Sequence, residues 1–185
     1  ETHTDNETGE GFSGELRAFN GELSGTLTNN YPYAVENAAV LLYNQLLIIG
    51  NMEPGETISL DNQPMTFCAT SFSYALASQI TGVSLYDMSG DMEDASYVQA
   101  LERANLLSFY IENYISGYHS QACVVAFGDG EENLDFMQQA DYEAYGCTLL
   151  TAQLEVNYEK GGKTYRSAMQ KQPNVLSGEY DAARN

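Results

Sequence analysis

The first third of the chain alternates between apolar and polar residues, which is typical of strands. Two alternating segments, 12–19 and 22–28, flank Asn20-Gly21, a dipeptide that favours the tight turn of a β-hairpin. The leucines of both segments are expected to face a core: Leu16, Leu23 and Leu27. Residues 12–28 are therefore predicted to form a hairpin.

The segment 35–50 is almost continuously apolar and is interrupted only by Asn44-Gln45. It predicts a strand near 37–43 and another near 45–49, both buried on their two faces. A turn follows at 53–56, where Pro54 and Gly55 stand, and a short alternating strand is expected at 57–60.

The period then changes to that of a helix. Apolar residues spaced for one helix face predict a helix over 71–81, with Ser71 as a cap and Gly82 as its C-terminal stop. A longer helix is expected to begin at Ser96, which forms a capping box with Gln99, and to stop at Gly117.

Strand patterns return in the last third. Segment 121–127 is apolar, and 146–158 alternates with a set of apolar residues on one face. That face comprises Leu150, Ala152, Leu154, Val156 and Tyr158. A second hairpin is predicted where 160–163 turns the chain onto 164–168.

Strands, then two helices, then strands again argue against alternating βαβ units. The predicted class is α+β, an antiparallel β-sandwich with a two-helix insertion packed against it. One domain is expected over 12–168 with the insertion at 64–118, a disordered leader at 1–11 and a polar tail at 169–185. The alternative is a small sandwich over 12–62 followed by a separate α+β domain over 63–168.

The charge of the chain reduces the range of possible partners. The chain has 26 acidic and 7 basic residues, a net charge of −19, and no Lys before position 160. Because nucleic acids and anionic membranes attract basic surfaces, neither is expected as a partner. No apolar run reaches the roughly 18 residues of a membrane span. The composition favours an extracytoplasmic location, secreted or on the cell surface.

The three cysteines, Cys68, Cys123 and Cys147, have no zinc-site spacing and are predicted to be small buried hydrophobes. Cys123 and Cys147 both lie in strand-like runs, so the sequence allows a strand-to-strand disulfide between them without requiring it. His119, four residues before Cys123, does not by its spacing imply a catalytic pair.

Acidic residues in the predicted loops suggest two uses. Paired carboxylates hydrolyse glycosides, and a hydrolase would draw on Asp87, Asp91, Asp129 and Asp135. Calcium prefers clustered oxygen ligands, and its candidates are Asp87, Asp91, Asp129, Glu131 and Asp135. The segment from Asp129 mimics an EF-hand opening but has Leu134 in place of the required Gly. No cofactor is predicted other than this candidate calcium.

Tyrosine is the abundant aromatic residue, with 14 copies against no Trp. Two pairs stand in predicted loops, where Tyr supplies contact area with a polar tip. These candidates for a recognition surface are Tyr31, Tyr33, Tyr142 and Tyr145.

Segment 25–61 carries a resemblance to a known group. Its strand ends in Thr-Asn-Asn, a turn and an apolar strand pair follow, and a Pro-Gly-Glu turn comes next. This order resembles immunoglobulin-like (Ig-like) β-sandwich ectodomain modules of bacterial surface and membrane proteins. The resemblance implies a noncatalytic extracellular module, often part of a longer membrane-anchored protein, and it implies no functional residues.

We therefore expect a noncatalytic extracytoplasmic binding or structural module of a bacterial surface protein, with a protein or cell-wall partner. The alternative is an extracytoplasmic hydrolase that uses the loop carboxylates.

Overall fold

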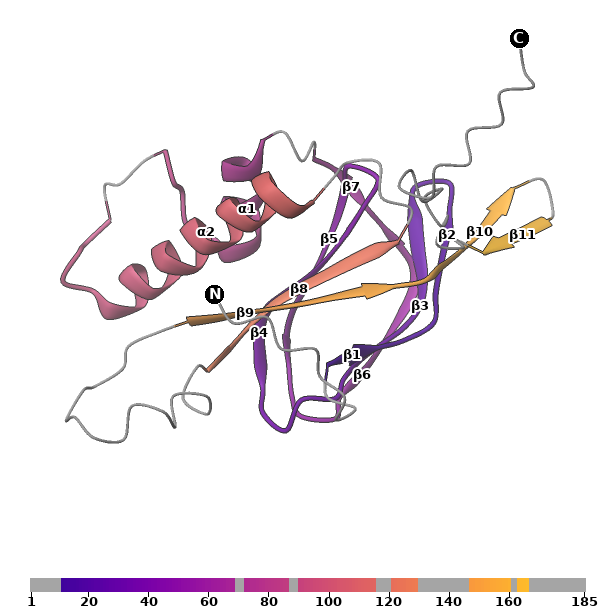
Figure 1. The fold of residues 1–185 in the computed structure, drawn as a ribbon, viewed down its shortest axis with the longest axis horizontal. Coiled ribbons are helices and arrows are strands. Elements are labelled where there is room, and N and C mark those ends of the chain that lie inside the picture. The colour runs from indigo at the N-terminus through magenta and orange to yellow at the C-terminus, as the bar shows by residue number, and fades with distance from the viewer. Residues whose placement is uncertain are drawn as a thin grey trace, which may run out of the picture.

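The computed structural model describes residues 11–68, 72–86, 90–115, 121–129, 147–160 and 163–166. These residues form two β-sheets and two helices, arranged in three layers with the helices outermost (Figure 1). The fold is thus rich in strands that are mostly antiparallel, with a helical layer on one side, as the sequence pattern predicts.

Sheet A is built around β3, which pairs with β6 along one edge and with β1 and β2 along the other. Next to β2 lies β10, in the parallel direction, and β11 follows as the partner of β10. The bounds are β1 (Phe12–Ser13), β2 (Leu16–Phe19), β3 (Glu22–Asn29), β6 (Thr57–Pro64), β10 (Val156–Lys160) and β11 (Lys163–Arg166).

Sheet B is antiparallel throughout and has the strand order β7-β5-β4-β8-β9. Its strands are β4 (Val35–Leu42), β5 (Gln45–Met52), β7 (Thr66–Phe67), β8 (Ala122–Asp129) and β9 (Cys147–Leu154). The pairings β4–β8 and β2–β10 join strands that lie before and after the helices in sequence.

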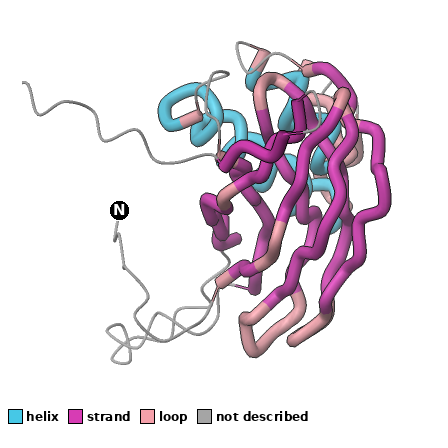
Figure 2. The backbone as a smooth tube through the Cα atoms, turned by 90° about the vertical axis from the view of Figure 1, so that its right-hand side faces the viewer, coloured by secondary structure: helices cyan, strands magenta, loops and turns pink. Residues whose placement is uncertain are grey.

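At two points the chain passes from a strand of one sheet to a strand of the other with a single residue between them. The chain leaves sheet A through β6 and enters sheet B as β7 after Met65, and it returns from β9 to β10 after Glu155. Figure 1 shows β9 and β10 as one long line across the molecule. The two sheets are therefore connected at both sides, and the strands run side by side around a shared interior (Figure 2).

That interior is an apolar core between the sheets. Sheet A contributes side chains such as Leu16, Leu23 and Leu27, each at most 1% exposed, and sheet B contributes the alternate residues of β4 and β8. The inward orientation predicted for the three leucines is confirmed. The alternating face of 150–158 also lies against this core, so its prediction is confirmed as well.

The first hairpin forms as predicted, with Asn20 and Gly21 at positive φ in the turn (50° and 81°). A close approach of backbones explains two further glycines beside it. A Cβ on Gly25 would lie 1.9 Å from the carbonyl oxygen of Glu15, and one on Gly14 would lie 2.0 Å from that of Thr26. Only glycine permits the backbones to pack this closely where β1 gives way to β2.

Strand β6 is longer than the predicted 57–60 because it stays paired with β3 as far as Pro64. Its last residues are polar and exposed, so no apolar alternation marks them in the sequence. Backbone pairing with β3, together with hydrogen bonds between Ser24 and Asn62, extends this strand.

A second core lies between sheet B and the helices α1 (Ser73–Thr81) and α2 (Ala95–Tyr114). The sheet face consists of the other alternate residues of β4 and β8, among them Ala39, Leu41 and Phe127. Strands β4 and β8 are therefore buried on both faces, which confirms the prediction for 37–43 except at Tyr43, which lies in the turn after β4. The same prediction for 45–49 is wrong, because the helices do not cover the outer face of β5 at Ile48, which is 49% exposed.

Of the predicted helix ends, the structure confirms one and corrects another. Gly82 closes α1 in the left-handed conformation (φ 76°), as predicted. The cap of α2 is Asp94, whose Oδ1 accepts from the backbone N and from the Oγ of Ser96, at 2.9 and 2.7 Å. The predicted capping box at Ser96 is wrong because the carboxylate two residues earlier captures the free N–H. Ser71 and Gly117 lie outside the described residues.

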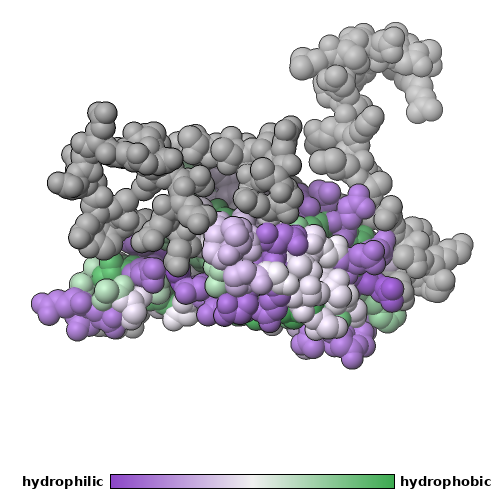
Figure 3. All heavy atoms as spheres, turned by 90° about the horizontal axis from the view of Figure 1, so that it is seen from below, coloured by the Kyte–Doolittle hydropathy of each residue, from purple (hydrophilic) through white to green (hydrophobic). Residues whose placement is uncertain are grey.

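Neither of the two described helices combines the length and the apolar character that crossing a membrane requires. Viewed from below, the described surface is largely hydrophilic, with hydrophobic residues in small separate groups (Figure 3).

Candidate functional site

The predicted acidic candidates are not assembled by the part of the chain that the structure describes. Asp91 is exposed, and its Oδ1 accepts from the backbone N of Glu93 at 2.9 Å in the turn before α2. Only the backbone of Asp129 is described, in the β8–β9 ladder, and the other three acids lie outside the described residues: Asp87, Glu131 and Asp135. Among described side chains, no group of three potential ligands could hold a metal ion. The calcium and hydrolase hypotheses therefore stay predictions.

The cysteines of the described structure are free thiols. Cys123 pairs with Gln153 and Cys147 with Asp129, so the two cysteines lie at opposite ends of the β8–β9 ladder, residue 123 against residue 129 of β8. That offset is roughly 20 Å of strand, far beyond the separation of up to about 7 Å that a disulfide spans. A disulfide between Cys123 and Cys147 is therefore excluded. Burial raises the pKa of Cys123 to about 11.

The predicted tyrosine surface is also corrected in part. Tyr31 is only 8% exposed and packs into the inter-sheet core, edge-on to Phe12 with ring centroids 5.5 Å apart. Tyr33 stacks on Tyr31 at 5.3 Å. Tyr142 and Tyr145 lie outside the described residues.

The buried amide of Asn29 explains why Tyr31 turns inward. Its Nδ2 donates to the carbonyl oxygens of Tyr33, Met52 and Glu53, at 3.0, 3.3 and 3.1 Å, and its Oδ1 accepts from the backbone N of Tyr31 at 3.0 Å. One side chain thus joins the turn after β3 to the turn after β5. The Thr-Asn-Asn and Pro-Gly-Glu segments noted in the sequence meet here, and their role is structural.

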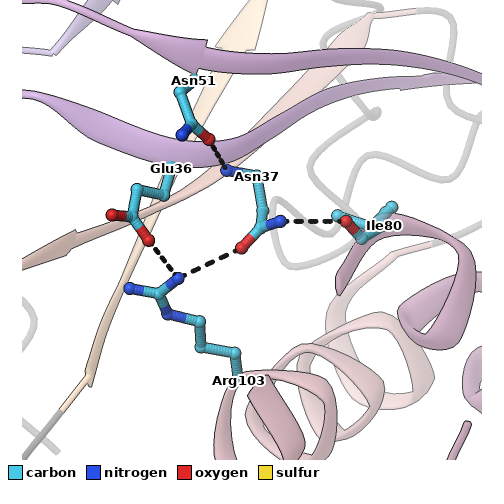
Figure 4. Close-up of polar contacts among 5 residues, drawn as sticks. All are labelled: Glu36, Asn37, Asn51, Ile80 and Arg103. Carbon is cyan, nitrogen blue, oxygen red and sulfur yellow. Dashed lines mark hydrogen bonds and ion pairs between the residues drawn. The ribbon is translucent and has the colours of Figure 1, made fainter. Parts of the chain in front are cut away.

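A second buried polar group joins the helices to sheet B. Arg103 of α2 is 6% exposed, and its guanidinium forms an ion pair with Glu36 and donates to Oδ1 of Asn37 at 3.2 Å (Figure 4). The guanidinium carbon also lies 5.5 Å from the ring centroid of Phe127, a cation–π distance.

Asn37 occupies a bulge of β4 at positive φ (52°), which turns its amide toward the helices. Its Nδ2 donates to the carbonyl oxygen of Ile80 in α1 at 3.2 Å, and its backbone N donates to Oδ1 of Asn51 at 3.2 Å (Figure 4). Nη1 of the guanidinium is occupied by Glu36 and Asn37, and the group lies against an aromatic ring inside the helix–sheet core. The cluster therefore positions α1 and α2 on the sheet and is not the best candidate for a ligand site.

The better candidate is a hollow at the end of the molecule where two hairpin turns meet. We call it the aromatic hollow. It has a volume of about 280 Å³ and is lined by Ala18, Phe19, Asn20, Gly21, Glu22, Leu42, Tyr43, Gln45 and Tyr158.

Backbone hydrogen bonds hold both turns of the aromatic hollow in place. The backbone N of Met65 donates to the carbonyl oxygen of Gly21 at 2.9 Å, and that of Cys68 donates to the carbonyl oxygen of Asn44 at 2.7 Å. The β2–β3 turn and the β4–β5 turn are thus both hydrogen-bonded to the segment 65–68, where the chain passes from β6 through β7. A Cβ on Gly21 would lie 3.6 Å from Nε2 of Gln45, so the two turns are in direct contact.

Aromatic rings form the walls of the hollow. Phe19 is 54% exposed and Tyr43 is 45% exposed, so about half of each ring is open to a partner. The rings of Tyr43 and Tyr158 lie 5.7 Å apart at an interplanar angle of 58°. Burial raises the pKa of Tyr158 well above its usual value, and the charge of Tyr43 and a hydrogen bond with it raise it further. The phenol of Tyr158 is therefore protonated at neutral pH.

Sequence analysis assigned Phe19, Tyr43 and Tyr158 to strands and missed the site that they form. One signal was available: both hairpins place an aromatic residue directly before the Asn of a tight turn, in Phe19-Asn20 and Tyr43-Asn44. Such a ring at a strand end cannot reach the core fully. That the two turns adjoin each other depends on the β6–β7 crossing, and that Tyr158 lies beside them depends on the pairing of β2 with β10.

Comparison with known proteins gives one match. The family described as "Domain of unknown function (DUF8725)" matches residues 11–157 of the chain. No curated protein and no solved structure matches the chain significantly.

Proposed function

We propose that this chain, which belongs to the DUF8725 family, is a noncatalytic extracytoplasmic binding module that contacts its partner through the aromatic hollow. The observation that carries the proposal is the exposure of Phe19 and Tyr43 on two turns whose backbones are fastened together. Leaving large rings in water costs free energy that a partner would recover by covering them.

The fold supports a binding module that is preorganised. Each turn of the hollow is held by a backbone hydrogen bond to the β6–β7 crossing, so little ordering is needed when a partner binds. Tyr and Phe lose little conformational freedom on contact, which makes them efficient contact residues.

We also propose that the two face-to-face sheets form an Ig-like sandwich and that 12–168 is one domain with the helices as an insertion. The pairings of β4 with β8 and of β2 with β10 support this, because each joins early and late strands. The extracytoplasmic location is supported by the charge of −19 and the scarcity of Lys. The chain would then act as part of a bacterial surface protein, with a protein or cell-wall partner.

The test is a sedimentation assay with cell-envelope material from the source organism, separated into wall and protein fractions. We expect the wild type to be retained by one fraction and the Phe19→Ala/Tyr43→Ala variant to bind at least about tenfold more weakly, about 1.4 kcal/mol. Both substituted side chains lie at the surface and are about half-exposed, so the variant is expected to fold, which circular dichroism checks.

A matched control is Tyr86→Ala, because Tyr86 is 74% exposed and contacts Tyr74 rather than the hollow. This variant should bind like the wild type. Equal retention of the wild type and the hollow variant, or no retention of the wild type by any fraction, would refute the proposal.

A further inference from the structure

We infer that the ligand of the aromatic hollow is a neutral saccharide, an inference that rests on the proposed function and names its ligand class. A sugar ring combines apolar C–H faces with hydroxyl groups that both donate and accept hydrogen bonds. The hollow offers a matching combination of exposed rings and short polar side chains.

The polar side chains that line the hollow suit hydroxyl groups. Asn20 and Gln45 carry primary amides, each with two N–H donors and a carbonyl acceptor, and Glu22 carries a carboxylate acceptor. Asn20 is exposed, while Glu22 and Gln45 are partly buried. Neighbouring hydroxyls of one sugar ring can engage such groups in pairs, while its C–H face lies on the ring of Phe19 or Tyr43.

Charge argues against an anionic ligand. Glu22 is the one charged side chain among the lining residues that the structure describes. The chain as a whole carries −19, so phosphate or carboxylate groups would be repelled on approach.

The arrangement of the rings argues against an organic cation. A quaternary ammonium group is best held by several ring faces around it. Tyr43 and Tyr158 instead contact each other at 5.7 Å and share a hydrogen bond, so they form one wall of the hollow and do not surround a central space.

The position of the hollow argues against an extended peptide. Peptides that add to a sheet need a free strand edge with a row of N–H and C=O groups. The hollow lies at strand ends, between turns whose carbonyl groups at Gly21 and Asn44 are already bonded. Its 280 Å³ equals the volume of about nine water molecules, which suits a single ring with the rest of a chain extending outward.

The experiment is a titration of the ¹⁵N-labelled chain with cellohexaose, chitohexaose and maltohexaose, followed by amide chemical shifts. At about 10 mM sugar, even a site with a Kd of about 1 mM is nearly saturated. We expect one of the three to shift the amide signals of 19–22 and 43–45 selectively. Tyr43→Ala and Asn20→Ala should each weaken that binding at least about threefold, and Tyr86→Ala should not change it.

Two outcomes overturn the inference. One is the absence of shifts in 19–22 and 43–45 with all three sugars, and the other is stronger shifts with choline than with any sugar. If retention on envelope material still depends on Phe19 and Tyr43 in either case, the binding module stands and only its saccharide ligand is refuted. If that dependence is lost, the proposed function itself fails.

Discussion

The two hydrophobic cores of the molecule are held together by different kinds of contact. Between sheets A and B, the chain passes directly from strand to strand at β6–β7 and β9–β10, which fixes the positions of the layers, and the buried Asn29 has a partner for each amide atom. Between sheet B and the helices, the polar contacts of the described residues are made by side chains, chiefly through Arg103 and Asn37.

The difference shows what each interface needs. The two sheets share strands that continue from one to the other after a single residue, so a polar side chain is required only where the turns meet. The helices have no such direct continuation into a sheet, and apolar packing alone would let them slide. A charged side chain with specific partners fixes their position, but Arg103 leaves its buried Nε without a hydrogen-bond partner. The second interface is therefore the less completely satisfied of the two.

The largest effect is expected from Asn29→Ala, which tests the inter-sheet side. It removes the four hydrogen bonds that hold the two turns together in a buried position, so the free energy of unfolding should fall by about 3 kcal/mol. Urea unfolding measures this. The neighbouring Asn30→Ala is the control, because Asn30 is exposed and bonds only to Ser13 Oγ among its side-chain contacts described here; it should cost less than about 0.5 kcal/mol. Similar losses for the two variants would show that Asn29 does not secure the turns.

A pH dependence comes next in size and tests the helix–sheet side, where the three cysteines lie. Burial raises the pKa of Cys123 from 9.0 to about 11, so the native state holds its proton more tightly than the unfolded state. The resulting stability is fully present below pH 9 and is lost as the pH rises through 11. Its size is about 2–3 kcal/mol.

The measurement is the free energy of unfolding of the wild type and of Cys123→Ala between pH 8 and pH 11. The wild type should lose more stability over this range than the variant. Tyr158 titrates at high pH in both proteins, so its contribution cancels in the difference. Tyr110 shares a hydrogen bond with Cys123, so the difference reports the titration of Cys123 together with this contact. Parallel curves would contradict the assignment of the alkaline loss to Cys123.

The smallest effect concerns the ion pair itself. Glu36→Gln leaves the buried guanidinium without a counter-charge and should cost about 1–2 kcal/mol, a reduced value because Glu36 is half-exposed. Arg103→Met keeps an apolar stem on Phe127 and removes the charge, and it should cost less than Glu36→Gln. Urea unfolding of both single variants and of the double variant measures these costs. If Arg103→Met lowers the free energy of unfolding more than Glu36→Gln does, the ion pair makes a net stabilising contribution, and the expectation is wrong.

Much of the local structure could be predicted because local rules determine it. Asn20-Gly21 specified its turn, Gly82 specified the end of α1, and the apolar run of 37–43 specified a strand buried on both faces. The cap of α2 was misplaced because Ser96 and Asp94 are both suitable caps in sequence, and only the geometry shows that the carboxylate is used. The idea of a Cys123–Cys147 disulfide failed for a related reason, since strand-like runs carry no information on register.

The candidate site shows where sequence reasoning ends. Tyr31 was expected at the surface because it stands in a turn, and Asn29 draws that turn inward. Tyr43 was expected inside a strand, yet it stands at a turn with its ring exposed. In both cases exposure depends on residues distant in sequence.

The sequence by itself determined the order of the main strands and helices, the buried faces of β2, β3 and β4, and the strongly acidic charge of the chain. These follow from period, turn residues and net charge, which are properties of neighbouring positions or of the whole composition. Only the tertiary structure decided that β6–β7 and β9–β10 cross between sheets, that Arg103 meets Glu36, and that Phe19, Tyr43 and Tyr158 share one hollow. Those contacts join residues far apart in the chain, and pairing register, which no local pattern encodes, sets them.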